Sequence, residues 1–202
     1  MVAHVLLDAD GVVQSVRGGW WPTLARLAGD RAVELTTLID RLEVPMLVGG
    51  DFPAVLRAAM AERFPDLGFD EAYAALWLSA EVSPATVALV RVLRAGGHGV
   101  HLGTNQHARR ASYMKGELGY GDLFDSCFYS CDLGLAKPDV AFFETVAREL
   151  GVSPADVLFV DDSATNVRGA QAAGMAAVRW QIEDGPEEIR SLLLAHGATL
   201  AP

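Results

Sequence analysis

Carboxylates are concentrated at two points of the sequence, and at both points they follow a short apolar run. Asp8 and Asp10 come after VAHVLL, and Asp161 and Asp162 come directly after VLFV. Adjacent acids at the end of a buried strand are costly unless they are paired or bind a metal. Such pairs suit either a hard cation or general acid/base chemistry. The alternative is an ordinary solvated turn, because Asp is a common turn residue.

Three other polar residues could belong to the same site. Thr104 and Asn105 follow the apolar run VHLG, and Lys137 lies in the segment GLAKPD. The chain has only two lysines, Lys115 and Lys137, whereas its other basic residues are arginines. Each feature also has a simpler interpretation. Thr104 and Asn105 could cap a helix, and Lys137 could be a solvated surface residue.

The elements that must position these residues alternate regularly after residue 83. Apolar patterns and Gly or Pro boundaries predict helices at 84–95, 108–118, 140–150, 164–173 and 186–194. Strands are expected at the start of 2–13 and at 99–102, 126–130, 157–160 and 175–180. This order predicts an α/β fold with a parallel sheet and helices on both faces. In such sheets ligands bind at the carboxyl ends of the strands, so the polar residues should meet there.

The segment 14–80 has a different character. It contains no convincing buried-strand run, and apolar residues recur at helical spacing in 17–28, 31–42, 52–64 and 70–79. We therefore predict a small helical cap at 14–80, inserted into a core domain formed by 1–13 and 81–202. Trp20, Trp21 and Trp77 are expected in the packing of this cap. Stacking on a substrate is the alternative for Trp20 or Trp21.

Composition limits the possible partners. The chain has 202 residues, of which 51% are hydrophobic, and this is enough for one domain with a substantial core. A net charge of −10 and a pI near 4.8 argue against nucleic-acid or anionic-membrane partners. An anionic substrate would need a local cation. No apolar stretch is long enough to span a membrane and no signal peptide is visible, so we expect a cytoplasmic protein.

Four strings give a family resemblance. DADGV, GTNQ, LAKPD and FVDDSATNV, in this order, resemble the four motifs of the haloacid dehalogenase-like hydrolase superfamily. The resemblance covers 2–13 and 84–180. It is closest to the branch with a small helical cap after the first motif, which includes haloacid dehalogenases and many sugar-phosphate phosphatases. The fold implied is a Rossmann-like core with a cap. Val12 and Asp161 stand where Thr and Gly are frequent, and neither change removes a required group.

The resemblance implies roles for the acidic residues. Asp8 would be the nucleophile that forms an acyl phosphate. Asp10 would protonate the leaving oxygen and then activate water, and its backbone carbonyl would bind Mg²⁺. Asp162 would be the second carboxylate on Mg²⁺. Asp161 would bind the metal through water or would hydrogen-bond to the groups that bind it.

The other motif residues would hold the substrate. Thr104 and the backbone amide of Asn105 would bind phosphate oxygens, and Lys137 would bridge the phosphate and the nucleophile. The charges agree with this, because a phosphate dianion could not approach four bare aspartates without Mg²⁺ and Lys137. The implied substrate is a small phosphorylated metabolite such as a sugar phosphate.

Other activities stay open at this point. Dehalogenases of this superfamily carry an aromatic residue where Asp10 stands and use no metal, so Asp10 and the Asp161–Asp162 pair favour a phosphatase. A phosphomutase is a further enzymatic alternative. A catalytically silent binding domain of the same fold is the alternative from another class.

Overall fold

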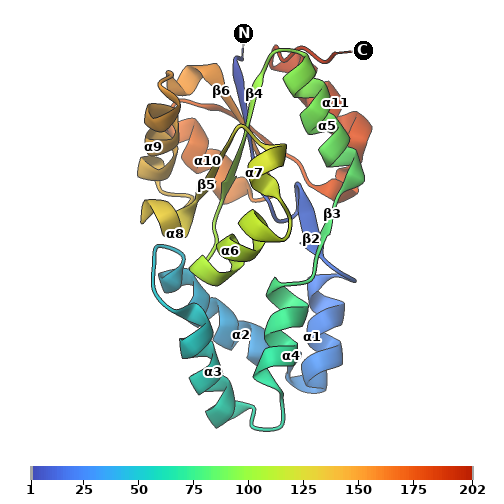
Figure 1. Ribbon diagram of the computed structural model, residues 1–202, viewed down its shortest axis with the longest axis vertical. Helices are drawn as coiled ribbons and strands as arrows, with labels where there is room; N and C mark the ends of the chain where they lie inside the picture. Colours follow the sequence, from blue (N-terminus) through green and yellow to red (C-terminus); the bar gives the residue numbers. More distant parts are fainter. Residues whose placement is uncertain (1, 202) are drawn as a thin grey trace.

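A five-stranded parallel sheet forms the centre of the molecule's larger part (Figure 1). The computed structural model describes residues 2–201. The sheet has the strand order β5-β4-β1-β6-β7, and every neighbouring pair is parallel. Its strands are β1 (His4–Leu7), β4 (Gly99–Thr104), β5 (Ser126–Tyr129), β6 (Val157–Asp161) and β7 (Ala176–Arg179). The predicted α/β class with a Rossmann-like parallel sheet is confirmed.

Helices cover both faces of this sheet, because side chains along each strand alternate between the faces. Val5 and Leu7 of β1 pack in one apolar cluster, and Leu6 between them packs in another. The first cluster includes residues of α5 (Pro84–Ala95), α6 (Ala108–Gly116), α7 (Tyr120–Leu123) and α11 (Pro186–Ala195). The second includes residues of α9 (Val140–Leu150) and α10 (Ala164–Ala172). The short α8 (Ser130–Leu133) follows β5.

Four helices form a separate group beyond the carboxyl ends of the strands, at the opposite end of the molecule from both termini (Figure 1). They are α1 (Trp20–Ala28), α2 (Ala32–Glu43), α3 (Phe52–Arg63) and α4 (Phe69–Trp77). Leu24, Leu38, Phe52, Leu56 and Trp77 belong to an apolar cluster drawn from this segment alone. This separate core supports the predicted cap at 14–80, although the division into two domains stays a prediction.

The prediction of no strand within 14–80 was wrong at the two ends of that segment. β2 (Gln14–Val16) and β3 (Ala80–Val82) form an antiparallel ribbon where the chain leaves and re-enters the core. Strands of three residues are too short to show an alternating pattern. The four-residue helices α7 and α8 were missed for the same reason. Short 3₁₀ helices occur at Gly29–Arg31, Val44–Met46, Pro154–Asp156 and Ile182–Asp184.

The helices of the described part of the chain are short. Across residues 2–201, none combines the length and the apolar character needed to cross a membrane.

Candidate active site

Three carboxylates meet at the carboxyl ends of two neighbouring strands. Asp8 directly follows β1, Asp161 is the last residue of β6, and Asp162 is the next residue. Because β1 and β6 pair in parallel, their ends lie side by side, and the backbone N–H of Asp8 donates to the carbonyl of Val160 at 2.9 Å. One carboxylate oxygen from each of Asp8, Asp161 and Asp162 lies within 4.8 Å of the other two. The sheet therefore brings together acids that are about 150 residues apart in the sequence.

Lys137 lies between two of these acids. Its Nζ is 2.8 Å from Oδ1 of Asp8 and 2.7 Å from Oδ2 of Asp161, and only 1% of its side chain is exposed. The interpretation of Lys137 as a solvated surface residue was therefore wrong. Burial alone would lower the pKa of Lys137, but Asp8 and Asp161 outweigh burial and raise it. Lys137 is thus a fixed positive charge at the ends of β1 and β6.

Asn105 holds the backbone of Lys137 in place. Its side-chain Nδ2 donates to the carbonyl of Lys137 at 2.8 Å, and its Oδ1 accepts from the Lys137 N–H at 2.9 Å. This side-chain role was not predicted. Only a contact between the backbone amide of Asn105 and phosphate was predicted, and that role stays a prediction.

Burial shifts the titration of two acids in this cluster. It raises the pKa of Asp8 to about 7, and Asp161 adds to this rise while Lys137 opposes it. It also raises the pKa of Asp162 to about 6, with Asp161 again contributing. Both shifts have the same cause, which is several carboxylates in a small desolvated volume. A divalent cation among them would favour their ionised forms.

Asp161 has its hydrogen-bonding capacity almost filled by the protein. Its Oδ1 accepts from the Ser163 N–H at 2.7 Å, Nδ2 of Asn166 lies 3.1 Å from both of its oxygens, and Lys137 occupies Oδ2. The side chain is fully buried, so the interpretation of this acid as part of a solvated turn was wrong. These contacts leave Asp8 and Asp162 with more oxygen capacity for a cation than Asp161 has.

Asp10 lies two residues beyond Asp8 and is held by three side-chain donors. Nη2 of Arg110 is 2.6 Å from Oδ1, Nε2 of Gln106 donates to Oδ2 at 2.8 Å, and Nε2 of Gln14 donates to Oδ1 at 3.0 Å. None of these three partners was predicted. Gln14 lies in the ribbon that was missed, and Arg110 is one of many arginines. Neither residue carries a local signal in the sequence for a contact with Asp10.

Gly11 makes the close approach between the two acidic segments possible. Its φ is 79°, a backbone conformation that glycine adopts without steric cost. A Cβ added there would lie 2.8 Å from Oδ2 of Asp162. Any larger residue would therefore displace a carboxylate of the cluster.

Thr104 ends β4 and is buried beside Asp10. Its Oγ1 accepts from Nε2 of Gln106 at 3.0 Å, and the same amide nitrogen reaches Asp10. The alternative of a helix cap formed by Thr104 and Asn105 was wrong, because His107 is the N-cap residue of α6. A phosphate contact for Thr104 stays a prediction.

A pocket extends from Asp10 toward the cap. It has a volume of about 370 Å³, and Asp10, Ser15, Trp20, Arg110 and Glu183 are among the residues that line it. Trp20, the first residue of α1, packs edge-on against Trp77 with ring centroids 5.8 Å apart. Trp21 does not line this pocket, and 55% of it is exposed. The two neighbouring tryptophans therefore have different environments, and of the two only Trp20 lines the pocket beside Asp10.

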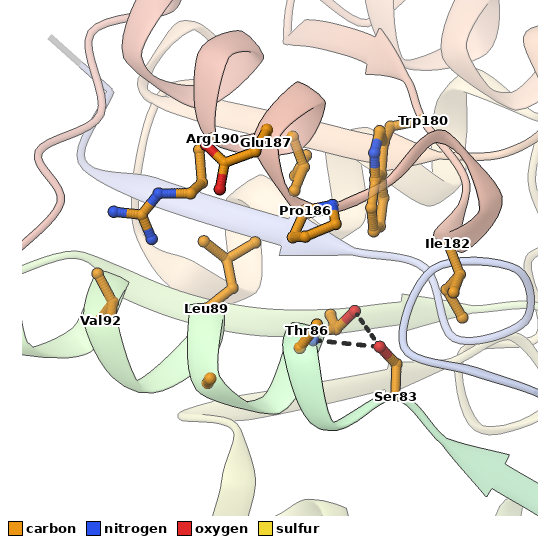
Figure 2. Close-up of a pocket in the computed structure, with 12 residues that line it drawn as sticks. Ser83, Thr86, Leu89, Val92, Trp180, Ile182, Pro186, Glu187 and Arg190 are labelled. Atoms are coloured by element: carbon orange, nitrogen blue, oxygen red, sulfur yellow. Dashed lines mark hydrogen bonds between the residues drawn. The ribbon is translucent and has the colours of Figure 1, made fainter.

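A second cavity, of about 280 Å³, lies between α5 and α11 (Figure 2). Leu89, Val92, Trp180 and Ile182 are among its lining residues, and Ser83 and Thr86 at one end hydrogen-bond to each other. None of the predicted site residues lines it. We therefore place the chemistry at the acidic cluster and not in this apolar cavity.

The residues of the acidic cluster fit a hard divalent cation. Asp8, Asp161 and Asp162 offer carboxylate oxygens close to one another, and Asp10 is a fourth negative charge nearby. The buried cations nearest to them are Lys137 and Arg110. Four carboxylates and two cations leave two negative charges, which one divalent ion would balance. Oxygen ligands of this kind are the ones that Mg²⁺ binds, usually with retained waters and substrate phosphate.

Comparisons with known proteins identify the family of this chain. The family model of the haloacid dehalogenase-like hydrolases matches residues 2–174. The chain therefore belongs to the haloacid dehalogenase-like hydrolases. A phosphoglycolate phosphatase of Pseudomonas savastanoi pv. phaseolicola is 30% identical over 188 residues, which are 86% of this chain and 67% of that protein.

Two further proteins are similar over different lengths. The sesquiterpene phosphatase astK of Aspergillus oryzae is 40% identical over 91 residues, which are 45% of this chain and only 46% of that protein. A Bacteroides thetaiotaomicron enzyme of the same family, solved with magnesium and inorganic phosphate, superposes with a TM-score of 0.75 at 20% identity. That match covers 94% of this chain and 99% of the other, and at this identity it shows the fold.

Proposed function

We propose that this chain is a Mg²⁺-dependent phosphomonoesterase that transfers the phosphoryl group of a small metabolite to Asp8 and then to water. The observation that carries the proposal is the pairing of Asp8 with Lys137 at 2.8 Å, beside Asp162 and two residues before Asp10. This arrangement provides a nucleophile, a fixed cation for phosphate oxygens, and a second carboxylate for proton transfer.

In the first step Asp8 attacks phosphorus and the ester oxygen departs. Lys137 holds the phosphate against Asp8, and Thr104 with the backbone amide of Asn105 binds the remaining phosphate oxygens. Asp10 donates a proton to the departing oxygen, because an alkoxide is a poor leaving group. In the second step Asp10 takes a proton from water, which attacks the phosphorus of the aspartyl phosphate and regenerates Asp8.

Asp8, Asp162 and the backbone carbonyl of Asp10 would hold Mg²⁺. Asp161, whose oxygens accept from Lys137, Ser163 and Asn166, would contact the metal only through water or would hold Lys137 in place. When bound, Mg²⁺ would neutralise charge on the phosphate and act as a Lewis acid toward it. The shared fold with an enzyme solved with magnesium and phosphate supports this cofactor.

Haloacid dehalogenation is the second candidate, since dehalogenases are among the solved structures with this fold. Release of halide needs no protonation of a leaving group and no metal. Here Asp10 is held by Arg110, Gln106 and Gln14, and the Asp161–Asp162 pair is present. Dehalogenation would need neither the carboxylate of Asp10 nor the Asp161–Asp162 pair, so their presence favours phosphoryl transfer.

The names of two relatives suggest different leaving groups for a substrate panel. One acts on a phosphoglycolate and the other on a sesquiterpene phosphate, so one is small and anionic and the other large and apolar. The pocket of about 370 Å³ between Asp10 and Trp20 is where the leaving group would lie. We propose a small phosphorylated metabolite and test sugar, carboxylate and prenyl phosphates side by side.

The metal requirement tests the proposed function. Phosphate release from an aryl phosphate should stop when the enzyme is treated with chelator and should return when Mg²⁺ is added. Ca²⁺ should support the reaction poorly, because it prefers more ligands and a looser geometry. Full phosphatase activity in excess chelator would contradict the proposal. Metal-independent halide release from a 2-haloacid would favour the second candidate.

The two tryptophans at the start of α1 test the leaving-group pocket. Trp20→Ala should change the relative rates across the substrate panel, because Trp20 lines the pocket beside Asp10. Trp21→Ala is the matched control and should leave these ratios unchanged, because Trp21 is largely exposed. The measurement is kcat/KM for each substrate with both variants. An equal loss for every substrate in Trp20→Ala would indicate destabilisation of the cap and no role in specificity.

A further inference from the structure

Arg110 is a buried cation whose side chain is directed at Asp10. Only 8% of the Arg110 side chain is exposed, compared with 40% of the Asp10 side chain. Its Nη2 lies 2.6 Å from Oδ1 of Asp10, the shortest of the three contacts that hold this carboxylate. An ion pair with a buried arginine fixes direction as well as charge, because the guanidinium is planar and rigid. Arg110 therefore limits where the Asp10 carboxylate can lie.

His107 lies in the same turn of α6 and makes contact with the cap. It is fully buried, and its ring centroid lies 4.7 Å from that of Phe52, 5.9 Å from that of Tyr73 and 6.2 Å from that of Trp77. These three aromatic residues belong to the apolar cluster of the cap. His107 is thus a core residue enclosed by cap side chains.

One hydrogen bond orients the His107 ring. Its Nδ1 accepts from the backbone N–H of Arg110 at 3.4 Å, which assigns the ring hydrogen to Nε2. Nε2 lies 3.7 Å from Oε1 of Glu43 in α2, and this same oxygen accepts from Nε1 of Trp77 at 2.8 Å. Burial lowers the pKa of His107 to about 3, so the ring is neutral at physiological pH.

One helical turn therefore contacts the cap through His107 and the candidate acid through Arg110. We propose that Arg110 is a positioning residue for the Asp10 carboxylate, and that His107 makes this positioning depend on the docking of the cap. The inference rests on the proposed function, in which Asp10 transfers the proton. When the cap moves away, His107 loses the aromatic ring contacts that fix the start of α6, and Arg110 loses its defined position. Asp10 is then held for proton transfer only while the cap covers the site.

The first test separates positioning from general stability. Arg110→Gln should lower kcat for an alkyl phosphate by roughly 10- to 100-fold, which is part of the contribution of a well-placed acid. It should lower kcat for an aryl phosphate much less, because an aryl oxide leaves with little help, and KM should change little for either. Arg110→Lys should recover part of the alkyl rate, and added guanidinium should recover part of it in Arg110→Gln. A loss by one common factor for both substrates would overturn the positioning role.

The matched control is the neighbouring residue. Arg109 also lies on α6 and stacks over the Tyr73 ring at 4.4 Å, but it is exposed and makes no contact with Asp10. Arg109→Gln removes the same charge from the same helix. The ratio of alkyl to aryl rates should stay within about twofold of wild type. A selective alkyl loss as large as that of Arg110→Gln would assign the effect to the charge of α6 and overturn the inference.

The second test concerns the coupling to the cap. His107→Asn keeps a side chain that can cap α6 and removes the ring from the cap cluster. It should produce the same selective loss of alkyl turnover. The double variant with Arg110→Gln should be little worse than Arg110→Gln alone, because both changes disrupt one arrangement. If the rate losses of the two single variants multiply in the double variant, the two residues act independently, and this result would overturn the coupling.

Amide hydrogen exchange gives a readout that does not depend on phosphatase activity. Arg110→Gln should increase exchange in residues 9–14 and leave the cap helices unchanged. His107→Asn should increase exchange in 9–14 and in the cap segment around Phe52, whereas Arg109→Gln should leave 9–14 as in wild type. Wild-type exchange at 9–14 in both test variants would overturn the inference. This measurement needs no turnover. A chain that shows the expected exchange but hydrolyses no phosphate would contradict the proposed function and leave the positioning inference intact.

Discussion

Asp8→Asn should lower phosphate release from every substrate, alkyl or aryl, by several orders of magnitude. The amide that replaces the carboxylate is a poor nucleophile, so the first step stops whatever the leaving group is. Loss of a nucleophile in other covalent enzymes costs roughly 10⁴- to 10⁶-fold in kcat, and we expect a loss in this range. Steady-state rates with an aryl phosphate and an alkyl phosphate measure it. A residual rate within tenfold of wild type would contradict the role of Asp8.

The pH dependence of the melting temperature tests whether the loss of activity in Asp8→Asn is caused by unfolding. Burial raises the pKa of Asp8 to about 7 in the folded chain, from an ordinary value near 3.8, so the unfolded chain releases this proton more readily. Ionisation of Asp8 therefore destabilises the metal-free fold increasingly as the pH rises from about 4 to about 7. Asp8→Asn removes this effect. In chelator its Tm should equal that of wild type near pH 4 and exceed it at pH 8.

Asp10→Asn should separate substrates by leaving group. An alkyl phosphate needs a proton on its departing oxygen and should lose about 10²- to 10⁴-fold in rate. An aryl phosphate leaves with little help, so it should still phosphorylate Asp8, but the second step then lacks the base that activates water. Rapid mixing with an aryl phosphate should therefore show a burst of aryl alcohol followed by slow turnover.

Asp10→Ala provides the comparison for this variant. Both changes remove the proton donor, but Asn keeps the size of Asp and one oxygen, which Arg110 can still contact. The burst should therefore be cleaner in Asp10→Asn. Equal rate losses for alkyl and aryl substrates, without a burst, would show that Asp10 does not transfer the proton.

Much of the fold could be predicted because each element carries its own local signal. The run VLFV predicts a buried strand, and Ser83 with Pro84 predicts the start of α5, where the Ser83 side chain accepts from the Thr86 N–H at 3.2 Å. The ribbon of β2 and β3 carries no such signal. Gln14 is buried there only because its side chain contacts Asp10 and the hydroxyl of Tyr120, a residue far along the chain.

The same distinction applies to the site. Asp8, Asp10 and Asp161 could be grouped in advance because parallel strands end at one edge of a sheet. The contacts of Arg110 and His107 could not be predicted, because they depend on how α6 lies between the core and the cap. The side-chain role of Asn105 was missed because its partner is a backbone segment in a distant loop.

The central claim, a covalent phosphoryl group on Asp8, can be tested most directly by locating that group. Asp10→Asn is mixed with an aryl phosphate and Mg²⁺, quenched in acid during the burst and treated with borohydride, which reduces an acyl phosphate to an alcohol. Peptide mass spectrometry should find the reduced side chain at Asp8, and Asp8→Asn treated in parallel should carry none. A reduced carboxylate at Asp10, Asp161 or Asp162, or an unmodified chain throughout a clear burst, would contradict this account.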